Sequence, residues 1–243
     1  MYAVTLPDLA VAFIPVLVTL GIVFFWSNSF RQSLVAIIRM LIQLLLIGYA
    51  LEFIFTAHSP WIILAVLSFM LIAASWIALG ALPVKRSALL IHCLIAIAGG
   101  GIFNLVLITQ GVLHADPWYK PAIMIPLAGM IFSNSMNSVS LAGERLYSEL
   151  EHHKDFARAR NAAFQAAMIP LVNSLLAVGL VSLPGMMTGQ ILAGTSPLVA
   201  ARYQIVVMCM IFSSAGISAA LFLWLTRHQG DKTDAREEAG KCG

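Results

Sequence analysis

Charged residues are scarce in this chain: Asp, Glu, Lys and Arg together make up 10% of its 243 residues. Soluble domains carry about 25% charged residues, and a chain so short of charge cannot cover a surface that faces water. Hydrophobic residues make up 60% instead, in runs long enough to cross a bilayer. Backbone groups in lipid must be hydrogen-bonded within their own segment, so these runs predict helices. The composition therefore predicts an all-α integral membrane protein.

Signatures of other protein classes are also missing. The cysteines, Cys93, Cys209 and Cys242, lack the spacing of metal ligands and are interpreted as packing or tail residues. The chain has no Gly-x-Ser-x-Gly or His-Glu-x-x-His motif, which argues against an enzyme. No apolar run holds a carboxylate near its middle, which argues against a carrier coupled to protons or sodium. The net charge of +3 does not indicate a nucleic-acid partner, because the basic residues lie near the edges of apolar runs.

Seven apolar runs are each close to the roughly 20 residues that a membrane-spanning helix needs. Their ranges are 9–26, 34–55, 61–82, 88–109, 122–141, 162–183 and 204–226. No linker rich in Pro, Gly or Ser separates them, so residues 1–226 are expected to form a single transmembrane domain. Residues 227–243 are polar and charged, which predicts a disordered cytoplasmic tail.

Basic residues are distributed unevenly between the two sides of these runs. With the N-terminus outside, eleven of the fourteen Lys and Arg residues fall in cytoplasmic loops or in the tail. Lys120 and Arg202 then lie outside, and Arg39 lies within a span. The positive-inside rule therefore predicts an external N-terminus and a cytoplasmic C-terminus.

The second run contains Arg39, and Gln43 follows it by one helical turn. Residues four apart share a face of a helix, so the two side chains are predicted to form an intramembrane polar pair. Charge inside a membrane is costly and usually functional. Arg39 is also only about two turns from the inner edge, so an arginine that merely reaches the lipid headgroups is an equal alternative.

The fifth run is unusually polar. Positions 126, 130, 133, 137 and 140 fall on one helical face and hold Pro, Met, Ser, Asn and Ser. The sixth run adds Gln165, Pro170, Asn173 and Ser174. Lipid penalises such faces, so they either line a polar pathway or pack against another helix. Amide oxygens, thioether sulfurs and carbonyls freed by proline coordinate cations weakly, which suits passage rather than storage.

Small residues mark two further runs. Gly99, Gly100 and Gly101 follow one another in the fourth run, and Ser214 and Ser218 lie one turn apart in the seventh. Small side chains let membrane helices approach closely, so both places are predicted to be helix contacts.

The segment 183–197 is apolar but contains Pro184, Gly185, Gly189, Gly194 and Pro197. So many helix-breaking residues exclude an eighth span. A hairpin that re-enters the membrane or lies on its outer surface is expected.

Charge is concentrated between the fifth and sixth runs, where residues 143–161 hold eight of the 25 charged residues. Leu146, Tyr147 and Leu150 fall on one face of a helix there. The pattern predicts an amphipathic cytoplasmic helix that docks a soluble subunit. An ordinary solvated loop is the alternative.

Three sequence segments in the second half of the chain are distinctive. They are Pro-Leu-Ala-Gly-Met-Ile-Phe-Ser-Asn-Ser-Met-Asn at 126–137, Ile169-Pro170 with Asn173-Ser174, and Val-Gly-Leu-Val-Ser-Leu-Pro-Gly-Met-Met-Thr-Gly-Gln-Ile-Leu-Ala-Gly at 178–194. Ser196-Pro197, Tyr203-Gln204-Ile205-Val206, and Arg39 with Gln43, Gly48 and Tyr49 extend them. Over roughly residues 30–225 the chain resembles the FetB-type permease family.

This resemblance implies the membrane subunit of an ATP-binding-cassette transporter in the bacterial inner membrane. Bacterial members are associated with iron export and resistance to oxidative stress, and plant relatives with aluminium tolerance. The chain has no Walker A motif, so ATP and Mg would bind to a separate cytoplasmic ATPase subunit, and no cofactor is expected on this chain. A homodimer in the lipid bilayer with two ATPase copies is the expected assembly.

The resemblance and the polar faces together give a set of expected site residues. The substrate pathway is expected to include Met130, Asn134, Asn137 and Asn173, with Met186 and Met187 at an outer gate. Bends are expected at Gly129, Pro170, Pro184 and Gly185. Contact with the ATPase is expected from Glu144, Arg145, Glu149, Glu151, Lys154 and Arg158. No residue is assigned as a metal ligand.

Two alternatives stay open. Residues 149–165 lack the Leu-Gly-Ala type motif that the family carries before the Ile-Pro of its sixth span, which favours a non-transporting scaffold or sensor. The polar faces of the fifth and sixth runs argue against it, because a scaffold does not need them. A path of neutral amides and thioethers also suits a permease for an organic solute such as a nucleotide sugar. The direction of transport is implied by the resemblance alone.

Overall fold

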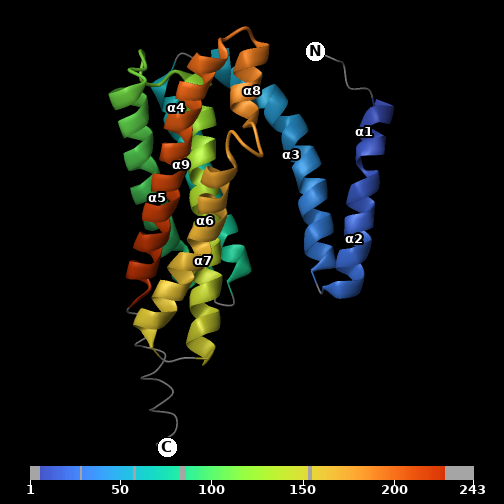
Figure 1. Ribbon diagram of the computed structural model, residues 1–243, viewed down its shortest axis with the longest axis vertical. Helices are drawn as coiled ribbons and strands as arrows, with labels where there is room; N and C mark the ends of the chain where they lie inside the picture. The colour runs from blue at the N-terminus through green and yellow to red at the C-terminus, as the bar shows by residue number, and fades with distance from the viewer. Residues whose placement is uncertain (1–5, 28, 57–58, 83–85, 153–154, 228–243) are drawn as a thin grey trace, which may run out of the picture. The chain divides into compact units, whose positions relative to one another are not determined.

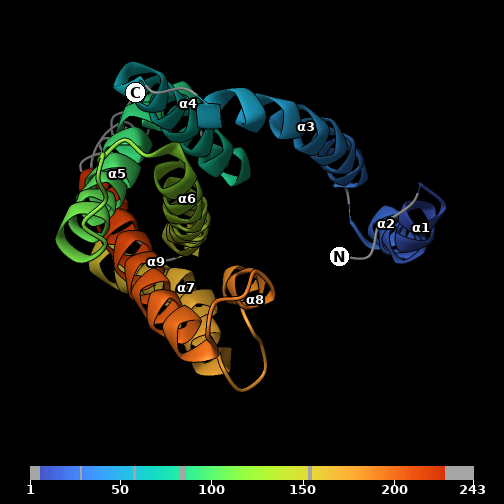
Figure 2. The same ribbon diagram turned by 90° about the horizontal axis from the view of Figure 1, so that it is seen from above.

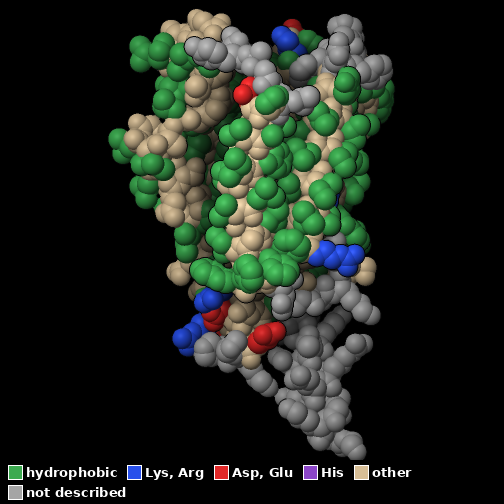
Figure 3. Space-filling view, turned by 90° about the vertical axis from the view of Figure 1, so that its right-hand side faces the viewer, with side chains coloured by type: hydrophobic (Ala, Val, Ile, Leu, Met, Phe, Trp, Pro, Cys, Tyr) green, Lys and Arg blue, Asp and Glu red, His purple; other side chains and the backbone are tan. Residues whose placement is uncertain are grey.

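The computed structural model describes residues 6–27, 29–56, 59–82, 86–152 and 155–227, and within these ranges its regular structure is helical. Six helical segments are long and apolar enough to cross a membrane: Pro7–Trp26, Phe30–Leu51, Pro60–Ala78, Ser87–Val112, Pro121–Glu151 and Pro197–Leu225. On the face drawn in Figure 3, hydrophobic side chains predominate and charged ones are few. The chain is an all-helical, multi-pass membrane protein, as its composition predicts.

The chain divides into two compact units, residues 1–57 and 58–243, where the sequence predicted a single domain. The first unit holds α1 (Leu6–Ala12), α2 (Ile14–Trp26) and α3 (Phe30–Thr56). Pro15 has no N–H to continue a helix, so α1 and α2 are separated at Phe13. Most described side chains of this unit are exposed, which suits contact with lipid.

The second unit is built around α9 (Pro197–Leu225), which packs against four other helices (Figures 1 and 2). These are α5 (Arg86–Val106), α6 (Pro121–His152), α7 (Phe156–Ala177) and α8 (Gly185–Leu192). The helix α4 (Pro60–Ala78) packs against α5 and α6 and continues into a 3₁₀ turn, η1 (Leu79–Ala81). A π-helical segment, η2 (Leu107–Val112), ends α5.

Small and polar residues hold α5 and α9 together. Gly100 lies so close to Ser214 and Ser218 that its position has no room for a side chain. Beside them, Ser213 Oγ donates a hydrogen bond to Oδ1 of Asn104. The Asn104 amide in turn donates to the carbonyl oxygen of Gly100 at 2.8 Å. The helix contact predicted from the glycine and serine positions is confirmed, and the Ser213–Asn104 hydrogen bond crosses it.

The sixth predicted span, residues 162–183, differs from the structure. Its helix, α7, begins at Phe156 and ends at Ala177, and it is not among the six segments that qualify by length and apolarity. The reason is composition, because Arg160, Asn161 and Gln165 interrupt its apolar residues. In Figure 1, α7 begins near the lower end of α6, and α8 lies higher, near the start of α9.

Between α7 and α8 the chain leaves the helix, and several of its backbone amides remain hydrogen-bonded. The amides of residues 180–182 all donate to the carbonyl oxygen of Ala177, at 2.8 to 3.2 Å. Gly179 adopts a φ of +83°, a conformation that favours glycine, and its amide donates to the carbonyl oxygen of Ser182. Where a hairpin was predicted over 183–197, the structure has helix α8 and a turn at Gly194 that leads into α9.

The charged segment 143–161 is not the single helix that its amphipathic pattern predicts. Residues 143–152 are the last turns of α6, and residues 156–161 are the first turns of α7. The apolar stripe of α6 continues through Leu146 and Leu150 against α7, so the helix does not stop where its charge begins. Residues 228–243, most of the predicted disordered tail, lie outside the described residues.

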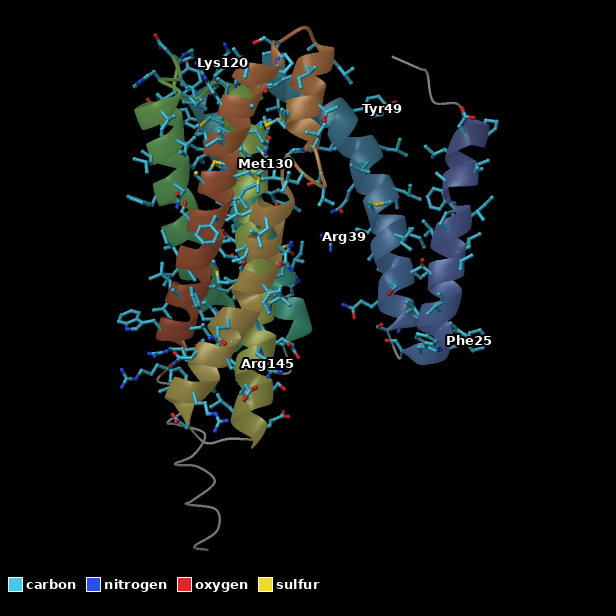
Figure 4. All side chains as sticks on the ribbon, viewed as in Figure 1. Phe25, Arg39, Tyr49, Lys120, Met130 and Arg145 are labelled. Carbon is cyan, nitrogen blue, oxygen red and sulfur yellow. The ribbon has the colours of Figure 1, made fainter. Side chains whose placement is uncertain are left out.

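Figure 4 places Lys120 and Arg145 at opposite ends of the second unit. The positive-inside prediction puts Lys120 outside and Arg145 in the cytoplasm, so it requires the two residues to lie on opposite sides of the membrane. Which side is cytoplasmic stays a prediction.

Candidate substrate pathway and coupling turn

A cavity lies where the middle parts of α6, α7 and α9 meet, and its volume is about 120 Å³. Its lining includes Asn134, Asn137 and Ser138 from α6, Ser174 from α7, and Met208 and Phe212 from α9. Aliphatic side chains complete the wall. The consecutive helices α6 and α7 and the later helix α9 therefore bring amides, hydroxyls and a thioether to one place.

The polar groups of the cavity differ in how firmly they are held. Asn134 Nδ2 donates a hydrogen bond to the carbonyl oxygen of Met130 at 2.8 Å, which fixes this amide along its own helix. Ser138 is buried, whereas Asn137 is exposed. The Asn134 amide is thus held in place on the cavity wall, and the Asn137 amide lies at the open side of the cavity.

Pro170 loosens α7 beside the cavity. A proline inside a helix has no N–H, so the carbonyl oxygen one turn earlier, that of Ala166, loses its helical donor. Pro126 has the same effect within α6. A carbonyl oxygen freed in this way is a ligand for water or a cation, and the helix that carries it bends more easily.

The size and neutrality of the cavity limit what it can hold. One water occupies about 30 Å³ of liquid, so this volume corresponds to about four waters. Pockets for organic ligands usually measure about 300–1,000 Å³. The side chains around the cavity are all uncharged. The space is therefore large enough for one ion with part of its hydration shell.

Of the six predicted pathway residues, the cavity brings together Asn134 and Asn137. The other four do not line it: Met130 is half-buried on α6 (Figure 4), Asn173 is exposed on α7, and Met186 and Met187 are half-buried on α8. Their roles in transport stay predictions. Of the bends, Pro170 lies in the cavity wall, and Pro184 immediately precedes α8, whose first residue is Gly185.

Sequence reasoning missed the contribution of α9. Met208 and Phe212 are four residues apart and so share a helical face, which was the available signal. The whole run is apolar, however, and nothing local distinguishes a residue facing a cavity from one packed in a helix contact.

The charged residues between α6 and α7 are carried by a closely packed helical hairpin. Ala159, Ala163 and Ala167 on α7 are at most 1% exposed and belong to one core cluster with Ala142 and Leu146 of α6. Small side chains four residues apart let two helices approach closely. Because Ala167 also lines the cavity, the charged turn and the cavity are joined by continuous packing.

Each helix of this hairpin carries a polar contact at its charged end. Arg145 Nη2 and Glu149 Oε1 form an ion pair at 2.5 Å. The Asp155 carboxylate caps α7 by accepting the backbone N–H groups of Ala157 at 2.9 Å and Arg158 at 3.3 Å. The remaining predicted contact residues are Glu144, Glu151 and Arg158, which are exposed, and Lys154, which lies outside the described residues.

Helix α6 is longer than a bilayer is thick. Its 32 residues span about 48 Å at about 1.5 Å per residue, against a hydrocarbon core of about 30 Å. If its apolar part fills the core, about 18 Å projects beyond it. The charged residues of 143–152 lie on that projecting part, at the end of α6 away from Lys120 (Figure 4).

In the first unit, Arg39 and Gln43 share one face of α3, as their spacing predicts. Together with Val35, Ile38 and Ile42 they border a shallow groove on that helix. Both side chains are exposed. Their functional role stays a prediction.

Comparison with known proteins adds independent information. Residues 6–229 match the family described as uncharacterised protein family UPF0014. A UPF0014 membrane protein of Synechocystis is 36% identical over 212 residues, which cover 79% of this chain and 82% of the relative. The probable iron export permease protein FetB of Escherichia coli is 35% identical over 203 residues, 77% of each chain. The protein ALUMINUM SENSITIVE 3 of Arabidopsis thaliana is 31% identical over 229 residues, 86% of this chain and 82% of the relative. No solved structure matches the chain.

Proposed function

Because the chain belongs to the UPF0014 family of membrane proteins, we propose that it is the membrane-spanning permease subunit of an ATP-binding-cassette transporter that exports iron or another metal ion. The observation that carries this proposal is the small neutral cavity between α6, α7 and α9. The similarity to a probable iron export permease supports a metal ion as the cargo.

The chemistry of the cavity favours transient binding of a cation. Amide and hydroxyl oxygens replace part of a hydration shell, and the Met208 thioether adds a soft ligand. No carboxylate or arginine in the wall holds the ion tightly or repels it. An ion that binds weakly can leave on the other side, which a transport site requires.

The α6–α7 hairpin is the part of the chain suited to transmit a conformational change from an ATPase subunit to the cavity. Contact at Arg145, Glu149 or Arg158 would displace the projecting end of α6 and the first turns of α7. The alanine contacts keep these two helices together, so the displacement would reach the cavity wall at Pro170, where α7 can bend. Closure of two ATPase subunits around ATP and Mg would in this way switch the side to which the cavity opens.

The proposed assembly contains two copies of this chain with two ATPase subunits in the bacterial inner membrane. Asn137 and Asn173 are exposed at the depth of the cavity, and lipid would penalise both amides. A second copy facing α6 and α7 would cover them. Helices α7 and α8 would together make a seventh, broken crossing, with the N-terminus outside and the C-terminus in the cytoplasm.

The test is ATP hydrolysis and metal efflux by the purified chain with a co-purified ATP-binding-cassette partner in lipid nanodiscs and vesicles, titrated with ferrous iron. We expect iron to stimulate hydrolysis. A hydrogen-bonding group that faces a charge contributes about 1.5–3 kcal/mol, so Asn137→Leu should weaken the apparent iron affinity roughly 10- to 100-fold. Asn173→Leu is the comparison variant, because it removes the same amide from the other predicted pathway position, which is exposed and outside the cavity.

Each alternative has its own outcome in this experiment. A stable complex whose hydrolysis ignores metals but responds to an organic solute would replace the metal by that solute. A chain that binds no ATPase and moves no ion would be a scaffold or sensor. Equal losses in the Asn137 and Asn173 variants would place the path along the exposed face of the hairpin instead of in the cavity.

A further inference from the structure

A second hollow lies at the end of the second unit where α7 begins and α9 ends. This groove has a volume of about 610 Å³ and is separate from the central cavity. Arg160 and Gln165 from α7 and Trp224 and Arg227 from the end of α9 are among its lining residues. It lies at the same end of the unit as the charged turn after α6 (Figure 1).

The charge of the groove has one sign. Arg160 of α7 and Arg227, just beyond the end of α9, both line it, and the other described side chains in its lining are neutral. Arg160 also donates from Nε and Nη2 to Oδ1 of Asn161, at 3.3 and 3.1 Å, and Asn161 lines the groove beside it. The nearby carboxylate of Asp155 already accepts two backbone amides as the cap of α7. The groove is therefore suited to an anion.

The rest of the groove is apolar and aromatic. Its lining includes Phe156 and Phe164 of α7 and Leu221 and Trp224 of α9. Trp224 is 66% exposed and lies one residue before the end of a helix that qualifies as a membrane span. Tryptophan at such a position is typical of the boundary between hydrocarbon and headgroups. A soluble anion would use the arginines and leave this aromatic wall without a partner.

We propose that this groove binds an anionic phospholipid, with the phosphate between Arg160 and Arg227 and the upper part of an acyl chain against Phe164 and Trp224. Guanidinium groups form paired hydrogen bonds with phosphate oxygens. Basic pockets between membrane helices at the cytoplasmic side are a common form of lipid headgroup recognition. The site needs no substrate and no ATPase, so its test is independent of the proposed transport activity.

The experiment measures lipid binding to the purified full chain in detergent by native mass spectrometry. The probes are dioleoyl-phosphatidylglycerol and dioleoyl-phosphatidylcholine, with inorganic phosphate as a competitor. The Arg160→Gln/Arg227→Gln variant removes both charges from the groove. The Lys120→Gln/Arg202→Gln variant is the matched control, because it removes two exposed charges at the opposite end of the unit. Circular dichroism and thermal midpoints check that both variants fold.

We expect the wild-type chain to prefer phosphatidylglycerol. Each basic residue near a membrane surface contributes about 1 kcal/mol, so loss of both arginines should reduce that preference roughly 10- to 30-fold, and the control should keep it. A brominated phosphatidylglycerol should quench a fluorescence component that disappears in Trp224→Phe.

Four results would overturn the proposal. They are equal binding of the two lipids to the wild type, an unchanged preference in the arginine variant, an equal loss in the control, and displacement of the lipid by inorganic phosphate at equal concentration. If the arginine variant kept its lipid preference but no longer bound the ATPase subunit, the groove would be a contact site for that subunit.

Discussion

Replacing Gly100 with alanine should separate α5 from α9. A Cβ atom at this position would lie 2.4 Å from Ser218 Oγ and 2.7 Å from the backbone oxygen of Ser214. The serine hydroxyl can rotate away, but the backbone oxygen moves only if the helix moves. Gly99 is the matched control on the same helix, since its added Cβ would meet Cδ1 of Leu221, the flexible end of a side chain, at 2.9 Å.

The expected sizes of the two effects follow from this difference. Overpacking a closed contact costs about 1–3 kcal/mol, and the backbone clash at Gly100 places it in the upper part of that range. Alanine regains about 0.5–1 kcal/mol over glycine in a helix. Gly100→Ala should therefore lose roughly 1–2 kcal/mol of unfolding free energy, and Gly99→Ala should be neutral or slightly stabilised. At about 2–4 °C per kcal/mol, the midpoint should fall by roughly 2–8 °C in the first variant.

The assay is thermal unfolding of the purified chain in one detergent. The readout is the fraction that remains monodisperse on size-exclusion chromatography after heating. Both variants carry the same substitution at adjacent positions, so changes in detergent binding or helix propensity are nearly common to them. If Gly100→Ala is as stable as Gly99→Ala, the close approach of α5 and α9 is wrong.

Three further substitutions test other parts of the structure. Pro170→Ala restores a backbone donor in α7, so the thermal midpoint should stay or rise while transport falls; a lower midpoint would show that the proline is needed for packing. Asn104→Leu removes the Ser213–Asn104 hydrogen bond that crosses from α9 to α5 and leaves the Ser213 hydroxyl with the carbonyl oxygen of Met210 as its acceptor. The expected cost is about 0.5–1.5 kcal/mol in the same assay, and no loss would contradict the bond. Arg145→Glu should lower binding of the ATPase subunit, measured by pull-down, and the exchanged pair Arg145→Glu/Glu149→Arg should restore it. The free energy of unfolding should change by only about 0.5 kcal/mol because the pair is partly exposed. If the exchanged pair does not restore binding, the ion pair has no role in it.

The helices and the polar face of α6 could be predicted from the sequence because both are local properties. Apolar length marks six of the spans, and the spacing of Asn134 and Asn137 indicates one side of a helix. The contact around Gly100 was also predictable, because three glycines in an apolar run serve close packing more readily than anything else.

The remainder of the site depends on which helices become neighbours. Met208 faces the cavity only because α9 packs against α6 and α7, and no local pattern encodes that choice. The charged residues after 143 suggested a separate helix, since charge usually marks the end of a span. Leu146 and Leu150 continue the apolar stripe of α6 beyond that point, and burial against α7 outweighs the change in composition.

The composition of α7 has a consequence for how the chain is made. During synthesis, α7 reaches the membrane before α9 exists, yet its buried alanines pack against both α6 and α9. A helix with Arg160, Asn161 and Gln165 near its start does not enter lipid readily by itself. Its insertion must wait for α6 to receive it and for α9 to close over it. Translation of residues 178–225, which completes α9, takes about 2–10 s at about 5–20 residues per second, and during that time the cavity lacks its third wall.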